Sequence, residues 1–354
     1  KPIKSYAEVK AGYAESGLTG APADAVLTFE AEDTVAYTND VTIRRENSND
    51  ITTTPYSATE KWLNIYGGSR WDTGNQSVTW NIHVETDGLY KLALHTCQNV
   101  NDGLPVYRQI AIDGEVPFAE LLAYQFPYSK FDTFTLSDES GEPFLFYLTA
   151  GTHTLTMTVK LGELAPIAAS LRDDMLLLSE IQLAINKLTG NEVDANYDYE
   201  FFAKIPTLEG DLQALSDSLQ QKIDQLQAIT GRNPSMASSL KSMKQQVDAM
   251  RRDSFSIARN ISDFRNTQTS LGTWYTTLLS APMMVDKIAV VAPDAEVPVP
   301  KRSFWKLLVV NLQSLFSSFV RSYSNISGVV DNEIAITESI DVWIARGTEW
   351  AELI

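Results

Sequence analysis

The 354-residue sequence has little cysteine and histidine, with one cysteine (Cys97) and three histidines. A single cysteine cannot form an intramolecular disulfide, and it excludes a metal site built on several cysteine ligands. No apolar run reaches the roughly 18 residues that a membrane-spanning helix needs. The sequence therefore predicts neither a disulfide framework nor a transmembrane helix.

Basic residues are in the minority. The 28 lysines and arginines stand against 45 aspartates and glutamates, which gives a formal net charge of −17. An acidic surface repels nucleic acid and anionic lipid, so we expect neither as a partner. The same charge is compatible with neutral ligands such as sugars and with divalent cations.

Motifs of common enzyme classes are missing as well. The sequence contains no P-loop, no G-x-G-x-x-G, no H-E-x-x-H and no G-x-S-x-G. His95 lies two residues before Cys97, which leaves a thiol–imidazole pair open as an alternative. Residues two apart on a strand are, however, ordinarily just neighbours on one face. The sequence therefore predicts a protein that is not an enzyme.

The chain begins at Lys1 without a methionine, a basic region or an apolar signal segment. We expect it to start downstream of a targeting signal. Residues 1–25 are predicted to form a short helix or an extended arm, followed by a linker.

From residue 26 to residue 160, short alternating apolar–polar runs are separated by turn signals such as Asp113-Gly114. Many short strands with this punctuation predict an antiparallel β-sandwich. The predicted strands are residues 26–32, 41–45, 62–65, 77–84, 88–96, 107–112, 131–136, 144–148 and 151–160.

The hydrophobic period changes from two to that of a helix at about residue 161. Residues 161–282 contain four amphipathic stripes, which lie within 164–188, 208–226, 236–250 and 257–278. Four helices with short connections predict an up-down-up-down bundle. Such a bundle returns the chain to the end where it left, so the isolated strand at 285–291 should emerge beside residue 160 and complete the sandwich.

The predicted fold class is therefore a multidomain α+β protein. A jelly-roll sandwich (26–160 plus 283–293) carries an inserted four-helix antiparallel bundle (161–282). Residues 294–338 are predicted as a linker and an apolar helix (304–323) that packs on a neighbouring domain, with a membrane-surface helix as the alternative. Residues 339–354 predict a strand and the start of a helix, which would open a truncated α/β domain.

Several motifs resemble the carbohydrate-binding β-sandwich modules of families 6 and 35. They are Phe29-Glu30-Ala31-Glu32 at the start, Gln76–Tyr90 in the centre, Ile110-Ala111-Ile112-Asp113-Gly114, and Gly151-Thr152-His153. Those modules end with a strand like Val285-Asp286-Lys287-Ile288, which here follows the helices. The resemblance implies that the bundle is inserted before the final strand.

That resemblance also implies a structural Ca²⁺ ion bound by Glu30, Glu32 and Asp286. Hard carboxylate and carbonyl oxygens are the ligands that Ca²⁺ prefers, and no histidine or cysteine is needed. The alternative is that the two glutamates are solvated charges at a sheet edge.

Sugar recognition in such modules uses aromatic faces together with polar groups. Trp71 is the best single candidate because Arg70 and Asp72 flank it. The other candidates are Tyr66, Tyr107, Tyr124 and Tyr128. Aromatic side chains are usually buried, and the bundle would make the sandwich a scaffold if it covered the binding surface.

Residues 341–354 resemble the first strand and helix of the extracellular solute-binding proteins of carbohydrate ABC importers. The resemblance implies an extracellular, cell-surface lipoprotein of a Gram-positive bacterium, attached to the membrane only through a lipid anchor outside this chain. Its partners would be an oligo- or polysaccharide and, through later lobes, the ABC permease. The alternatives are a purely structural scaffold that docks on the transport lobes and an accessory module of a glycoside hydrolase.

Overall fold

The structure is a computed structural model that describes residues 2–57, 61–190 and 193–300. The apolar helix predicted at 304–323 and the α/β segment predicted at 339–354 lie outside the described residues. None of the described helices is both long enough and apolar enough to cross a membrane.

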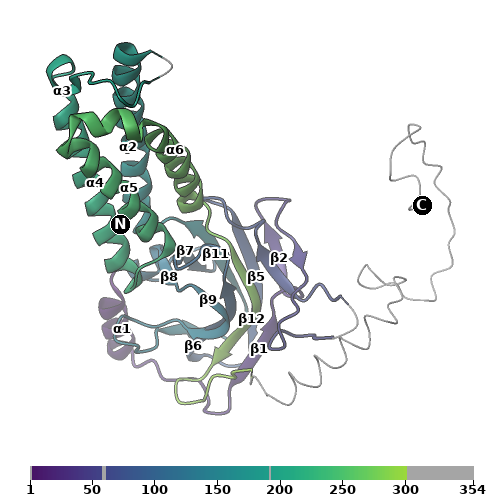
Figure 1. The fold of residues 1–354 in the computed structure, drawn as a ribbon. Coiled ribbons are helices and arrows are strands. Elements are labelled where there is room, and N and C mark those ends of the chain that lie inside the picture. The colour runs from purple at the N-terminus through teal and green to yellow at the C-terminus, as the bar shows by residue number, and fades with distance from the viewer. Residues whose placement is uncertain (1, 58–60, 191–192, 301–354) are drawn as a thin grey trace, which may run out of the picture.

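The β region is a sandwich of two antiparallel sheets (Figure 1). The seven-stranded sheet consists of β1 (Val26–Glu30), β3 (Arg45–Glu46), β4 (Ile65–Gly68), β6 (Gly88–Gln98), β9 (Ser129–Thr135), β10 (Leu145–Leu148) and β12 (Met283–Val291). The five-stranded sheet consists of β2 (Val35–Thr38), β5 (Ser77–Val84), β7 (Val106–Ile112), β8 (Tyr124–Phe126) and β11 (Gly151–Lys160). Alternate residues of each strand, such as Trp80, Leu94 and Leu155, fill the core between the sheets.

Strand β12 lies inside the larger sheet although it follows the helices in the chain. It pairs with β1 (Phe29↔Ile288) on one side and with β6 (Leu94↔Ile288) on the other. Because its neighbours come from the start and the middle of the sandwich, the helices are an insertion before the last strand. The predicted fold class is confirmed.

The insertion is a bundle that stands on one end of the sandwich (Figure 1). Its long helices are α2 (Leu164–Thr189), α4 (Leu208–Thr230), α5 (Ser235–Arg252) and α6 (Ser254–Leu279), and a short α3 (Phe201–Lys204) precedes α4. Each long helix buries one apolar stripe in a shared core. Asp253 alone separates α5 from α6 and caps the latter, because its carboxylate accepts a hydrogen bond of 3.0 Å from Phe255 N–H.

The N-terminal arm is a helix packed on the sandwich, α1 (Tyr6–Glu15). Ser5 and Glu8 form a capping box at its start. The Tyr6 ring packs edge-on to Phe144 at 4.6 Å, and the Tyr6 hydroxyl accepts a 2.9 Å hydrogen bond from Leu145 N–H. The first part of the predicted arm and linker is therefore a docked element of the sandwich.

The structure differs from the predicted strands at four places. The residues predicted as a strand at 41–45 begin as a turn, in which the Asp40 carboxylate accepts from Thr42 N–H at 2.9 Å. Trp62, expected inside a strand, lies in a loop and is 36% exposed, because β4 begins only at Ile65. The short strands β2 and β8 were not predicted, since four and three residues are too few to show a period.

Candidate functional site

The predicted acidic residues meet where β1 and β12 lie side by side. Ala31 N–H donates to the backbone oxygen of Asp286 at 2.8 Å. Thr54 joins the carboxylates, since its N–H donates to Asp286 Oδ1 at 2.9 Å and its hydroxyl donates to Glu30 Oε2 at 2.9 Å. We call Glu30, Glu32 and Asp286 the acidic cluster.

Two members of the acidic cluster are buried carboxyl groups. Asp286 is fully buried and Glu32 is 4% exposed. The pKa of each is raised to about 7, mainly by burial and in part by the nearby Glu30 carboxylate, while the hydrogen bond from Thr54 N–H opposes the rise at Asp286. Glu32 Oε2 and Asp286 Oδ2 accept no hydrogen bond from the described residues, and the ionisable side chain that the structure pairs with Asp286 Oδ2 is His95, whose Nε2 lies 3.9 Å away. A buried carboxylate oxygen without a hydrogen bond is costly, so this site favours either a proton or a cation.

The acidic cluster fits Ca²⁺ in the kind of donor it offers, namely carboxylate oxygens, two of which accept no hydrogen bond from the described residues. Its geometry is less complete. No three acidic, histidine or cysteine side chains in the described part of the chain lie close enough to hold one ion together. Glu30 is also engaged by Lys287, whose Nζ lies 3.2 Å from Glu30 Oε1. Glu32 and Asp286 are thus the best-placed ligands, and backbone oxygens would have to complete the shell.

Three of the predicted sugar-binding aromatics offer no surface to a ligand. Trp71 is completely buried, and its ring packs edge-on to Trp80 at 5.8 Å. Tyr66 is 7% exposed and donates its hydroxyl to Ile43 O at 3.3 Å. Tyr107 is 3% exposed. The prediction that these rings stack on sugar is therefore wrong for this structure, because their large apolar faces are buried in the protein's own cores.

The remaining candidates are only partly available. Tyr124 is half-buried on β8, and its hydroxyl accepts from Ser137 N–H at 3.1 Å. Tyr128 lies beneath the Arg232 guanidinium, 5.3 Å from the ring centre, so the α4–α5 turn covers it. Arg70 is exposed and pairs with Glu46 at 3.3 Å.

Asp72 contacts the end of the inserted bundle and not a ligand surface. Its carboxylate accepts from the Ser280 hydroxyl at 2.7 Å, and its backbone oxygen accepts from Ala281 N–H at 2.8 Å. The loop expected to recognise sugar thus holds the chain where it leaves α6. Sequence reasoning also missed Arg108, which shares this contact. The available signal was a charged side chain in the apolar strand Val106–Ile112.

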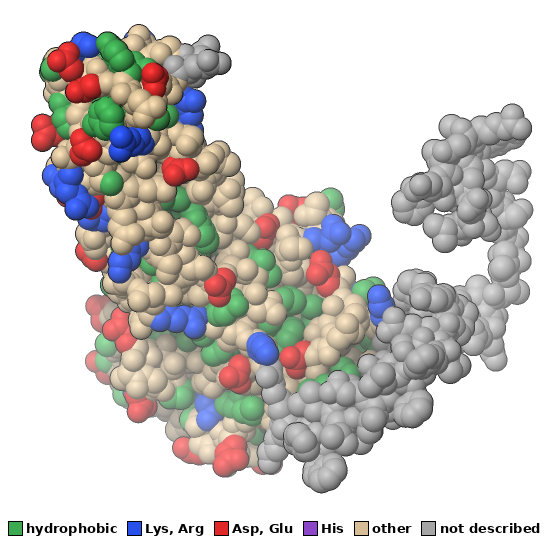
Figure 2. Space-filling model, viewed as in Figure 1, with side chains coloured by type: hydrophobic (Ala, Val, Ile, Leu, Met, Phe, Trp, Pro, Cys, Tyr) green, Lys and Arg blue, Asp and Glu red, His purple; other side chains and the backbone are tan. Residues whose placement is uncertain are grey.

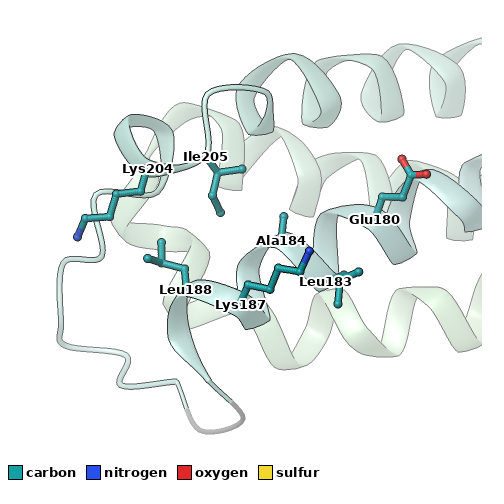
Figure 3. Close-up of a pocket in the computed structure, with 7 residues that line it drawn as sticks. All are labelled: Glu180, Leu183, Ala184, Lys187, Leu188, Lys204 and Ile205. Atoms are coloured by element: carbon teal, nitrogen blue, oxygen red, sulfur yellow. The ribbon is translucent and has the colours of Figure 1, made fainter.

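A pocket of about 500 Å³ lies at the far end of the bundle (Figure 3). Ala184 and Leu188 of α2 face Ile205 across it. The other lining residues are Glu180, Leu183, Lys187 and Lys204. In Figure 2, hydrophobic side chains lie among charged ones at this end of the molecule. Sequence reasoning did not predict the pocket, because the α2 stripe identifies the buried face of the helix and not its outer one.

One comparison with known protein families gives a match to the bundle. Residues 166–279 match the family model described as the bacterial solute-binding protein, 4-helix bundle domain. A comparison with curated proteins gave no match.

Solved structures similar to this chain include carbohydrate-active proteins. A cycloisomaltooligosaccharide glucanotransferase from Paenibacillus sp. is 20% identical over 45% of this chain and 21% of its own, with a TM-score of 0.28. A family 35 carbohydrate-binding module from Clostridium thermocellum is 11% identical over 38% of this chain and 87% of its own, with a TM-score of 0.27. The family 35 module from Paenibacillus barcinonensis is 15% identical, over 38% and 88%, with a TM-score of 0.27. Residues 166–279 of the inserted bundle are thus similar to the four-helix-bundle domain of bacterial solute-binding proteins.

Proposed function

We propose that this chain is a non-catalytic accessory region of a bacterial solute-binding protein that serves a carbohydrate ABC importer. The observation that carries the proposal is the bundle with the solute-binding family match, inserted before the last strand of a sandwich whose motifs resemble carbohydrate-binding modules. In this proposal the protein is an extracellular, lipid-anchored surface protein. Its lobes beyond this region meet the permease.

The attachment of the bundle supports a role in positioning. Both ends of the insertion continue directly into sandwich strands, β11 before it and β12 after it. Leu104 and Tyr107 of the sandwich also pack into the bundle core. Two covalent connections and a shared core restrict rotation of the bundle, so it would hold a neighbouring lobe in a set orientation.

The test uses the full-length protein in its own cells, with residues 163–280 replaced by a short Gly-Ser linker. We expect solute affinity, measured by calorimetry on the purified protein, to stay within twofold of wild type, while transporter-dependent uptake falls at least fivefold. Lys187→Ala, at the bundle's far end, is the matched control and should transport normally. Unchanged uptake after the deletion would refute a positioning role.

Glycan binding by the sandwich is a second candidate, and the exposure of Trp62 favours it. Asn47 Nδ2 donates to Trp62 O at 2.7 Å, and Asn64 Nδ2 donates to Thr53 Oγ1 at 3.0 Å. Thr54, the residue after Thr53, contacts the acidic cluster through Asp286 and Glu30. An exposed aromatic face beside polar groups is the chemistry that binds a sugar ring.

A glycan array tests this second candidate directly. We expect the wild-type protein to bind one or more glycans on the array and the Trp62→Ala variant to bind none of them. Tyr37, an exposed aromatic residue on β2 of the other sheet, is the control, and Tyr37→Ala should bind the same glycans as wild type. If the wild-type protein bound no glycan, only the positioning role would remain.

We further propose Ca²⁺ as a structural ion of the acidic cluster.

A further inference from the structure

Arg108 is a charged side chain with no exposed surface, on the strand β7. Burial lowers the pKa of its guanidinium to about 9, and the neighbouring Asp72 opposes that shift. A buried charge is tolerated only where hydrogen bonds and nearby charges replace its hydration. The partners of Arg108 therefore show what the side chain does.

Those partners are backbone oxygens from three separate segments. Nη1 donates to Tyr107 O at 3.0 Å, and Nη2 donates to Trp71 O at 3.2 Å and to Ala281 O at 2.6 Å. The guanidinium also lies 4.3 Å from the centre of the Trp71 ring. A planar group with five donors can link several carbonyls and stack on an indole at once, which an ammonium cannot do.

Ala281, the second residue after α6, is held at both of its backbone polar groups. Its oxygen accepts from Arg108, and its N–H donates to Asp72 O at 2.8 Å. The Asp72 carboxylate accepts from the hydroxyl of Ser280 at 2.7 Å. The chain is thus fixed at the point where the bundle ends and β12 begins.

The other end of the insertion meets the same place. Gly162 has a φ of +52° and lies against the Tyr107 ring so closely that a Cβ there would come within 2.3 Å of a ring carbon. Tyr107 is the neighbour of Arg108 on β7. The entry and the exit of the bundle therefore both pack on Tyr107–Arg108.

We propose that Arg108 and Asp72 form a clamp that fixes the direction of the bundle relative to the sandwich, so that the two move as one rigid body. The clamp explains why the loop predicted to bind sugar is buried. The inference goes beyond the proposed function, and it stands or falls independently of transport.

The test measures distances between two spin labels, one on the sandwich at Glu115→Cys and one at the far end of the bundle at Lys187→Cys. Both positions are exposed. The buried Cys97 is replaced by Ala in this background. Wild type should give a single narrow distance distribution, and Arg108→Met should widen it at least twofold. Arg108→Lys keeps the charge but has no planar group with two terminal nitrogens to span these carbonyls while stacking on Trp71, so it should widen the distribution as well.

Arg70→Met is the matched control, because this exposed arginine two residues before Asp72 contacts Glu46 and not the bundle. It should leave the width unchanged. A broad wild-type distribution, or an Arg108→Met distribution as narrow as that of wild type, overturns the clamp. If Arg108→Met does not fold, the same distance measurement on Asp72→Ala and on Ser280→Ala tests the clamp instead. Broadening in both supports the clamp, and wild-type width in either overturns it. The distance measurement does not depend on uptake, so a failure of the clamp can be told apart from a failure of the proposed function in transport.

Discussion

Two buried carboxyl groups, Glu32 and Asp286, give the acidic cluster a large pH dependence. Their pKa values are raised to about 7, whereas unfolded carboxyls titrate near pH 4. Between these values the folded state binds more protons than the unfolded state, so stability falls as pH rises from about 4 to above 7. A bound cation would remove this loss.

We therefore expect the melting temperature in chelator to fall between pH 5 and pH 8. Asp286→Asn should flatten this dependence, because an amide carries no charge. Added Ca²⁺ should raise the melting temperature of wild type at pH 8 far more than at pH 5, and should not stabilise Asp286→Asn. Asp173→Asn, an exposed carboxyl on α2, is the control. A melting temperature at pH 8 that is the same in chelator and in Ca²⁺ would reject the calcium proposal.

His153, near the start of β11, carries a pH dependence of the same sign but from a cation, because its pKa is also raised in the folded state. Burial lowers its pKa, but the hydrogen bond to Asp113 at 2.6 Å and the contact of Nε2 with Thr149 O at 2.7 Å raise it by more. Protonated His153 thus stabilises the fold below its unfolded pKa of about 6.5, and this contribution is lost as pH rises through the folded value.

Replacing His153 by Gln should therefore destabilise the protein at pH 5.5 and have little effect at pH 9. Urea denaturation at the two pH values measures the difference. An equal loss at both would show that packing, and not the charge, accounts for the effect.

At the scale of elements, the helices and most strands could be predicted because each shows its period over many residues. Examples are the apolar stripe of α4, the alternation of apolar and polar residues in β11, and the isolated strand β12. The role of Trp71 could not be predicted in this way. A sequence shows that an aromatic residue follows a turn, but it does not show that Arg108, far away in the chain, stacks on its ring and hydrogen-bonds its backbone oxygen. The acidic cluster was predictable because motif order places β12 beside β1.

A buried ion pair joins two helices of the bundle. Lys222 Nζ on α4 lies 2.7 Å from Asp174 Oδ2 on α2, and both residues are almost fully buried. Ser218 adds a hydrogen bond of 2.7 Å to the Asp174 carboxylate. The ion pair can form in only one register of α2 against α4. A purely apolar contact between the two helices would define that register less well.

Lys222→Met should reduce the free energy of unfolding by roughly 3–5 kcal/mol, because it leaves the Asp174 carboxylate buried without its cation. Adding Asp174→Leu should recover most of the loss. Urea denaturation of the single and double variants checks both statements. A double variant as unstable as Lys222→Met would show that the carboxylate is not the source of the loss.

At the scale of the whole molecule, the clamp strengthens the contact between two hydrophobic cores. The sandwich core and the bundle core meet near Tyr107, which belongs to the bundle core although it lies on β7. When the contact between two cores is strong, opening one exposes the other, and both unfold together. We expect wild type to melt in one calorimetric transition whose calorimetric and van't Hoff enthalpies agree. Arg108→Met should separate it into two transitions, while Arg70→Met keeps one. Two transitions in wild type would mean that the cores are coupled only by the chain, and the bundle would then be a hinged arm on the sandwich.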